Sequence, residues 1–167
     1  MIRNDLSRVA DTGSVKVTKP LQLEKYPTLW QMTSTVTAKT TSSCAHIISA
    51  LFPCASITGA PKIETMKIID ELETQARGLY TGSIGYIAPG GLAQFSVAIR
   101  TAVMHLDSKR LNYGVGSGIV WDSDPQSEYE ECLLKSKAID NVTETQTFQL
   151  LETLRWQKGH NKILFLI

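Results

Sequence analysis

The chain has few cysteines, no long apolar run and almost no net charge, and each shortage excludes a class of protein. The three cysteines are odd in number and lack metal-ligand spacing, which argues against a disulfide framework or a zinc site. No apolar run approaches the length of a membrane-spanning helix, and the early charges at Arg3, Asp5 and Arg8 do not fit a signal peptide. A net charge of +1 gives no strong field for nucleic acid or an anionic membrane.

What remains is the composition of an ordinary globular protein. The 167 residues are 43% hydrophobic and 20% charged, enough for one domain with its own core. We therefore expect a cytoplasmic protein, and neither nucleic acid nor membrane among its partners.

Hydrophobic spacing, caps and turn residues predict an α+β fold built on an antiparallel β-sheet. The predicted strands are residues 13–17, 28–37, 79–88, 92–105 and 109–121, and the predicted helices are residues 45–51, 61–74 and 125–140. Ser42 or Ser43 suits the cap of the first helix, and Asp124 followed by Pro125 suits the start of the last. The turn signal Pro89-Gly90-Gly91 favours an antiparallel meander.

The last predicted helix carries a site-like face. Glu128, Glu131 and Lys135 are spaced three and four apart, so a helix projects all three from one side. Two neighbouring carboxylates repel unless a cation lies between them, and oxygen ligands of this kind suit Mg2+. The alternative is a solvated helix face with an ordinary Glu–Lys pair.

Several short motifs follow one another in a fixed order along residues 1 to 140. They are Arg3-Asn4-Asp5-Leu6, Ser56-Ile57-Thr58-Gly59-Ala60-Pro61-Lys62, Gly82-Ser83-Ile84-Gly85-Tyr86, Ala98-Ile99-Arg100-Thr101 and Gly116-Ser117-Gly118-Ile119-Val120, followed by the helix with Glu128 and Glu131. In this order they resemble the chorismate-binding enzymes, a family that includes anthranilate synthase, aminodeoxychorismate synthase and isochorismate synthase. The resemblance implies that family's fold, an antiparallel sheet packed with helices.

The resemblance also implies a substrate site for chorismate. Tyr86 and Arg100 are expected at the carboxylate of the enolpyruvyl group, where an arginine fork and a tyrosine hydroxyl suit the chemistry. The segment Gly116, Ser117 and Gly118 is expected at a substrate carboxylate, since glycine lets backbone N–H groups approach an anion.

The loop carrying Ser56 and Thr58 is expected to present further donors, while the role of Lys62 is left open. A lone glycine pair otherwise indicates only a strand bend, and a serine–threonine loop otherwise indicates only a cap.

The acidic helix takes the metal role in this interpretation. Glu131 is expected to bind Mg2+ directly and Glu128 directly or through water, so that the ion holds the ring carboxylate and helps a hydroxyl depart. Lys135 would neutralise the cluster or meet a substrate oxygen, and Lys135 and Thr58 are the expected catalytic residues.

Within the family, the Ser56–Lys62 segment looks more like aminodeoxychorismate synthase component I than anthranilate synthase. That resemblance implies amination of chorismate to 4-amino-4-deoxychorismate on the route to para-aminobenzoate and folate, with ammonia from a glutamine amidotransferase subunit. Anthranilate synthase component I, or an isochorismate or salicylate synthase attacking with water, are the alternatives. A further alternative is an inactive remnant that only binds a partner or a ligand.

The resemblance divides the chain at about residue 140. Residues 1–140 match the C-terminal part of the chorismate-binding domain, and residues 141–167 read as a linker and the start of a truncated lyase-like domain, because residues 148–156 resemble its first strand. The family's other metal-binding glutamate and the nucleophilic lysine of the synthases would precede Met1. We therefore expect the chain alone neither to turn over chorismate nor to hold Mg2+ tightly, and to self-associate or pair with an N-terminal half.

Overall fold

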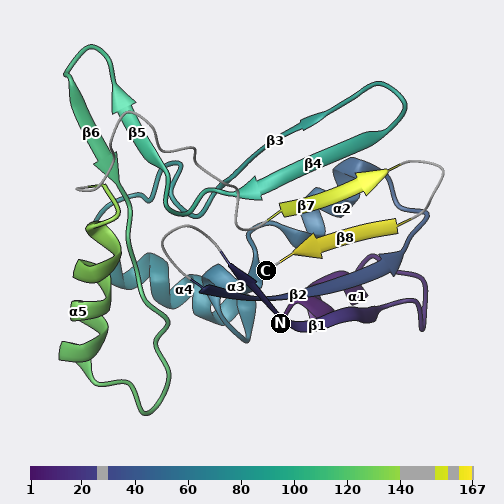
Figure 1. The fold of residues 1–167 in the computed structure, drawn as a ribbon, viewed down its shortest axis with the longest axis horizontal. Coiled ribbons are helices and arrows are strands. Elements are labelled where there is room, and N and C mark those ends of the chain that lie inside the picture. The colour runs from purple at the N-terminus through teal and green to yellow at the C-terminus, as the bar shows by residue number, and fades with distance from the viewer. Residues whose placement is uncertain (26–29, 140–152, 158–161, 167) are drawn as a thin grey trace. The chain divides into compact units, whose positions relative to one another are not determined.

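A computed structural model of the chain describes residues 1–25, 30–139, 153–157 and 162–166. The chain divides into two compact units, which are described separately. The first contains Met1–Ala76, Ser83–Val97 and Leu150–Ile167, and the second contains Arg77–Gly82 and Ala98–Gln149. Figure 1 shows the elements of both.

The first unit is built on a six-stranded antiparallel sheet. Its strands, in spatial order, are β1 (Lys16–Lys25), β2 (Trp30–Lys39), β8 (Lys162–Leu166), β7 (Thr153–Gln157), β4 (Leu92–Val97) and β3 (Ser83–Ile87). The β7–β8 hairpin therefore lies between β2 and β4, far from either in sequence (Figure 1). The antiparallel sheet expected from the sequence is confirmed.

The described residues of the first unit form four helices: α1 (Ile2–Ser7), α2 (Cys44–Leu51), α3 (Ala55–Thr58) and α4 (Lys62–Leu72). The Ser43 hydroxyl accepts a hydrogen bond from the backbone N–H of His46 at 3.3 Å, so Ser43 rather than Ser42 caps α2. No single helix among the described residues is long and apolar enough to cross a membrane, and only the pair Cys44–Thr58 and Lys62–Leu72, bent by 64°, passes that test jointly.

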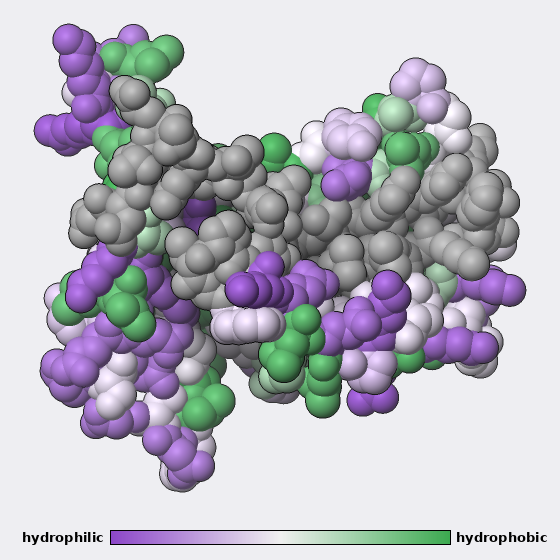
Figure 2. Space-filling view, in the orientation of Figure 1, coloured by the Kyte–Doolittle hydropathy of each residue, from purple (hydrophilic) through white to green (hydrophobic). Residues whose placement is uncertain are grey.

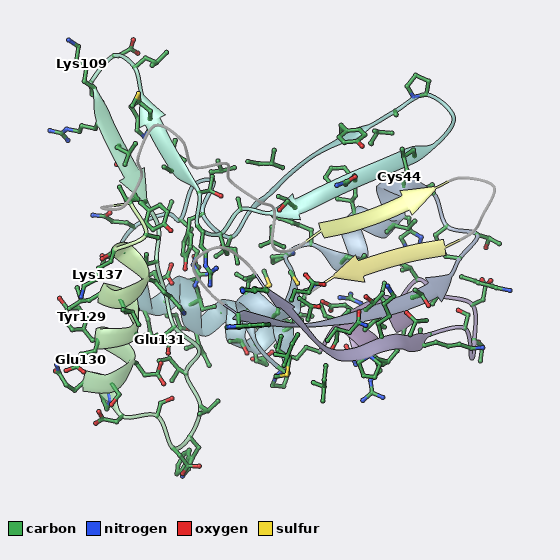
Figure 3. All side chains as sticks on the ribbon, viewed as in Figure 1. Cys44, Lys109, Tyr129, Glu130, Glu131 and Lys137 are labelled. Carbon is green, nitrogen blue, oxygen red and sulfur yellow. The ribbon has the colours of Figure 1, made fainter. Side chains whose placement is uncertain are left out.

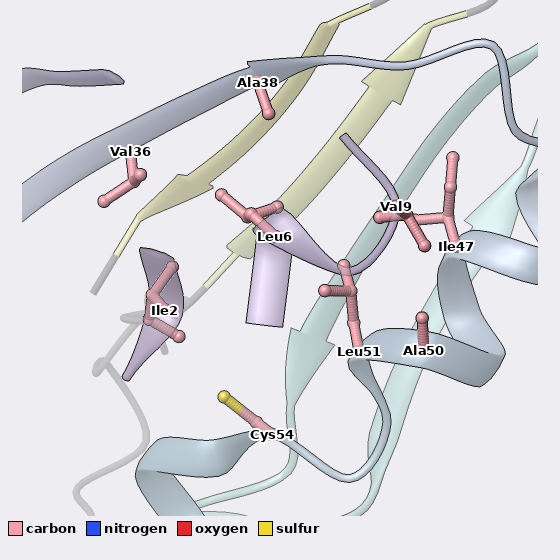
Figure 4. Packing of buried hydrophobic residues seen from close by; sticks show 9 residues of the cluster. All are labelled: Ile2, Leu6, Val9, Val36, Ala38, Ile47, Ala50, Leu51 and Cys54. Atoms are coloured by element: carbon pink, nitrogen blue, oxygen red, sulfur yellow. The ribbon is translucent and has the colours of Figure 1, made fainter. Parts of the chain in front are cut away.

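The core lies where α1 and α2 meet β2. Leu6 is fully buried, and the apolar cluster around it comprises Ile2, Val9, Val36, Ala38, Ile47, Ala50, Leu51 and Cys54 (Figure 4). The short helix α1 is thus anchored by its apolar side, because an isolated helix of this length is not stable in water.

Where the structure describes it, the second unit contains a two-stranded sheet and one helix. Strands β5 (Ala102–His105) and β6 (Arg110–Tyr113) pair antiparallel, and helix α5 runs over Pro125–Ser136. The Asp124 carboxylate accepts hydrogen bonds from the backbone N–H and the hydroxyl of Ser127, at 2.9 and 2.8 Å. The expected cap and first-position proline are confirmed, and they fix where α5 begins.

Several expected boundaries are wrong. The predicted strand 92–105 is two strands in different sheets: the pairing with β3 continues to Ala98, which bonds with Thr81 and Gly82, and the chain then turns at Arg100, whose φ is +48°. The predicted strand 109–121 ends at Tyr113, and the one at 13–17 begins at Lys16 and continues to Lys25. The helices α1 and α3 were not predicted. Residues 28, 29, 140 and the expected linker, together with residues 148–152, lie outside the described residues.

Large apolar side chains remain exposed in both units. They include Leu72 and Leu23 in the first, and Trp121, Leu106 and Ile119 in the second. On the face drawn in Figure 2, apolar and polar residues are interspersed.

Candidate functional site

The predicted face of α5 is present in the second unit. The Lys135 ammonium lies 2.5 Å from Glu131 Oε1, one helical turn away, and also donates to the backbone carbonyl of Gly116 at 2.8 Å. Figure 3 shows Glu131 on the opposite side of the helix from Glu130. Lys135 therefore ties the acidic face of α5 to the glycine-containing segment, 19 residues earlier in the chain.

Glu128 has the most unusual surroundings on this face. The Ser123 hydroxyl donates to its Oε1 at 2.6 Å, whereas its Oε2 is buried and accepts no hydrogen bond of ordinary geometry from the described residues. Hydrogen bonding from the Ser123 hydroxyl, and more weakly from the Ser117 hydroxyl at a geometry outside the ordinary range, holds the pKa of Glu128 below its usual value, with a smaller contribution from Lys135. A buried anionic oxygen without a partner suits a cation.

These residues fit a hard divalent ion in part. Glu128 Oε2 offers one oxygen, and Glu131 lies one turn further along the same helix, although its carboxylate already pairs with Lys135. No group of three or more acidic, histidine or cysteine ligands occurs among the residues that the structure describes. Magnesium tolerates such a sparse set, because it keeps several waters and takes oxygens from its substrate.

Two glycines in and just before the Gly116–Gly118 segment, Gly114 and Gly116, pack closely against Tyr80. A Cβ atom at Gly116 would lie 2.7 Å from the Tyr80 hydroxyl oxygen, and one at Gly114 would lie 2.3 Å from the Tyr80 ring. Gly118 has no atom within 4 Å of such a position. Close packing against Tyr80, which sequence reasoning did not identify, thus requires glycine at positions 114 and 116. The segment follows β6 as irregular chain rather than ending a strand as expected.

Arg100 lies at the turn between β4 and β5 in the second unit. Its φ of +48° is rare for a residue with a side chain, and backbone strain of this kind often marks functional positions. The guanidinium is exposed and lies near Tyr113. Burial raises the pKa of the Tyr113 hydroxyl, and the positive charge of Arg100 partly opposes that rise. An exposed guanidinium on a turn can receive a carboxylate.

Tyr86 lies on β3 of the first unit, on an exposed part of the sheet. Its hydroxyl lies 3.4 Å from the Oε1 atom of Gln94, its direct partner across the β3–β4 pair. The turn joining these strands contains Gly90 and Gly91, both with positive φ, as a tight hairpin requires. The tyrosine is held at a fixed register, and its long contact to Gln94 leaves the hydroxyl available to a ligand.

Ser56 and Thr58 lie in the short helix α3, also in the first unit. The Thr58 hydroxyl donates to the carbonyl of Cys54 at 3.1 Å, and the Ser56 hydroxyl lies 3.0 Å from the Cys54 sulfur. Gly59 ends the helix with a φ of +127°. The expected loop is therefore a helical turn, and Thr58 offers an acceptor in this conformation, because its proton is already engaged.

The structure thus places the expected residues in two sets. Glu128, Glu131, Lys135 and Gly116 come together in the second unit, where Arg100 also lies, and Tyr86 and Thr58 lie in the first. Sequence reasoning missed Ser123 and Tyr80. Ser123 stands beside the cap Asp124-Pro125, and that position was the available signal for it.

The described residues thus form an antiparallel sheet packed with helices in the first unit, and a carboxylate-bearing helix tied to a glycine segment in the second. Residues 1–141 match the family described as chorismate binding enzymes. The chain is 44% identical over 147 residues to an aminodeoxychorismate synthase of Streptomyces griseus, covering 87% of this chain and 20% of the relative. It is 39% identical over 146 residues to anthranilate synthase component 1 of Aquifex aeolicus, covering 86% and 29%.

A solved structure agrees with these sequences. Anthranilate synthase component I from Streptococcus pneumoniae superimposes with a TM-score of 0.69 at 35% identity, covering 82% of this chain and 32% of that one. This chain belongs to the chorismate-binding enzyme family. It spans between about a fifth and a third of the length of these relatives.

Proposed function

We propose that this chain forms part of the chorismate site of an aminodeoxychorismate synthase component I, which aminates chorismate to 4-amino-4-deoxychorismate for para-aminobenzoate and folate synthesis. Relatives named aminodeoxychorismate synthase in Streptomyces griseus and Arabidopsis thaliana support this proposal, being 44% and 42% identical over 147 and 144 residues. The observation that carries the proposal is the buried Glu128 Oε2, which lacks a partner among the described residues on a helix tied by Lys135 to the Gly116 carbonyl. A dianionic substrate bound through Mg2+ suits such a site.

In this proposal each predicted residue keeps its role. Glu128 and Glu131 would hold Mg2+, and Lys135, which pairs with Glu131, would neutralise the cluster or meet a substrate oxygen. Carboxylates of the substrate would be bound by Arg100, Tyr86 and the Gly116–Gly118 segment. Thr58 would contact the substrate and act with Lys135 as a catalytic residue. The bound ion would supply charge neutralisation at the ring carboxylate. A glutamine amidotransferase subunit would supply ammonia, and the protein would act in the cytoplasm.

Calorimetric titration tests the binding part of this proposal. The chain is expected to bind chorismate only when Mg2+ is present, to bind Mg2+ itself weakly, and to form no product. Glu128→Gln should lower chorismate affinity about tenfold or more, which is about 1.4 kcal/mol. Glu130→Gln is the matched control, because Glu130 lies on the same helix but contacts Gln126. Equal losses in both variants, or binding independent of Mg2+, would contradict the metal assignment.

Product analysis tests the reaction. Residues 1–141 can replace the matching segment of the Streptomyces griseus synthase, and the chimera can be supplied with chorismate, Mg2+ and ammonium. The proposal requires 4-amino-4-deoxychorismate from this chimera. If the same segment works only within the Aquifex aeolicus anthranilate synthase component 1, the runner-up function is favoured. If neither chimera forms a product although both fold, the segment is an inactive binding remnant.

Two expectations about the rest of the chain stay predictions. The lyase-like character of residues 148–156 is one of them. The other is association with a second copy or with an N-terminal half, which the exposed apolar residues Trp121 and Leu106 support. Light scattering of the purified chain tests the self-association.

A further inference from the structure

Lys62, whose role the motif left open, is the first residue of α4, and its side chain reaches the C-terminal end of helix α2. Its ammonium is 3.3 Å from the carbonyl of Leu51, 3.5 Å from that of Ala50 and 3.4 Å from Asp5 Oδ1. The two carbonyls belong to the last residues of α2, where a helix leaves its carbonyls without internal partners and carries partial negative charge. The Arg8 guanidinium also donates to Ala50, at 3.3 Å. Lys62 therefore caps α2 through space, from the first position of α4.

Asp5 joins this cap to the next helix. Its side chain is 4% exposed, and its Oδ2 accepts a hydrogen bond from the backbone N–H of Ala55, the first residue of α3, at 3.0 Å. Its Oδ1 faces Lys62, whose side chain is 13% exposed. A carboxylate this buried requires both partners, because an unpaired buried charge is strongly unfavourable. One ion pair thus connects α1, the end of α2, the start of α3 and the start of α4.

The segment from Ala55 to Lys62 is held at both ends by this pair. Ala55 is bonded to Asp5 at one end, and Lys62 is paired with Asp5 at the other. Between them lie Thr58 and Gly59, and the φ of +127° at Gly59 lets the chain reverse between α3 and α4. Both ends converge on one carboxylate, so the conformation of the segment depends on a residue about 50 positions earlier.

We propose that Asp5 and Lys62 form a positioning pair that fixes residues 55–61, and with them Thr58, in a single conformation. In this proposal the pair acts through the segment that it holds. That the pair holds the segment in one conformation is the mechanical part of the proposal, and it is independent of the proposed function. That this conformation places Thr58 for the substrate is the functional consequence, and it rests on the proposed function.

Hydrogen exchange measured by NMR tests the mechanical part. The amides of Ile57 and Thr58 donate to the carbonyl of Cys54, just before the segment, and that of Gly59 donates to the carbonyl of Ala55. In Lys62→Met, which keeps an apolar stem without the charge, their exchange should accelerate about tenfold or more, equivalent to about 1.4 kcal/mol of opening. The amides of β2 should change much less. Asp5→Asn, nearly isosteric, should act in the same direction and serves if Lys62→Met does not fold.

Lys67→Met is the matched control. Lys67 is on the same helix and pairs with Glu64 at 2.9 Å, but both side chains are 63% exposed, so this pair contributes little. Exchange in the segment should stay within about twofold of the parent. The proposal is wrong if the segment amides exchange at the parent rate in Lys62→Met and Asp5→Asn. It is also wrong if exchange of the β2 amides accelerates by the same factor, because the pair then only stabilises the whole unit.

Chorismate titration in the presence of Mg2+ tests the functional consequence. Lys62→Met should lower chorismate affinity by a factor similar to that of the segment opening, and Lys67→Met should not. Affinity unchanged in Lys62→Met, with the segment opened, would separate the pair from the substrate site and overturn that consequence. A parent chain that binds no chorismate, with the exchange result as expected, would overturn the proposed function and leave the positioning pair standing.

Discussion

The packing of Tyr80 against Gly116 gives a prediction whose magnitude follows from the structure. In Gly116→Ala the new Cβ would lie 2.7 Å from the Tyr80 hydroxyl oxygen, well inside the optimal contact distance of about 3.5–4.0 Å. Overpacking of this kind costs about 1–3 kcal/mol, because the ring or the segment must move. We therefore expect the free energy of unfolding to fall by about 2 kcal/mol.

Removing the hydroxyl should relieve the clash. In Tyr80→Phe the next nearest ring atom, Cζ, is 3.8 Å from the position of the new Cβ, an ordinary contact. Gly116→Ala in the Tyr80→Phe background should therefore cost less than about 0.5 kcal/mol. The cycle of four proteins then gives a coupling of about 1.5 kcal/mol, within the range for residues in contact.

Urea denaturation followed by circular dichroism measures all four proteins. Gly118→Ala is the control, because a Cβ atom there meets nothing within 4 Å, and its effect should stay within about 0.5 kcal/mol. The reasoning fails if Gly116→Ala and Gly118→Ala are equally destabilising, or if Tyr80→Phe does not reduce the cost of Gly116→Ala. The glycine at 116 would then serve backbone conformation or ligand approach rather than packing against Tyr80.

Three further predictions concern the core, a helix cap and a carboxylate. Leu6→Ala, at a fully buried position, should lower the free energy of unfolding by about 3–5 kcal/mol in urea denaturation, with a loss below about 1 kcal/mol refuting its central place in the core. Ser43→Ala removes the acceptor for the His46 amide and should cost about 1 kcal/mol, whereas Ser43→Asp should cost almost nothing. The pKa of Glu128 is lowered in the folded protein, first by the Ser123 hydroxyl, so the ionised carboxylate stabilises the fold. This stabilisation is complete above the unfolded pKa of about 4.3 and is lost as the pH falls through the lower pKa of the folded state. Ser123→Ala should raise the pKa of Glu128 in an NMR titration, and an unchanged value would show that Ser123 is not the cause.

Local signals predicted the parts of the fold that are decided within a few residues. The caps at Ser43 and Asp124, the turn at Gly90 and Gly91, and the spacing of Glu131 and Lys135 all act over four residues or fewer, so the sequence contains both partners of each interaction. The order of the motifs indicated the family, which the match over residues 1–141 confirms. The antiparallel type of the sheet and the positions of helices α2 and α5 were predicted from these local caps, turns and spacings.

Interactions between distant residues decided the rest. Nothing local marks the end of β4, because residues 92–105 read as one continuous strand. The pairing with β3 continues to Ala98, which bonds with Thr81 and Gly82, and the break follows at Arg100 with its positive φ. The short helices α1 and α3 exist because Leu6 is buried against the core and because the Asp5 carboxylate meets the Ala55 amide. Such contacts depend on which elements pack together, and burial then sets their strength. The sequence by itself therefore determined the family and the acidic face of α5, while the tertiary structure alone decided that Asp5 pairs with Lys62 and that Tyr80 lies against Gly116.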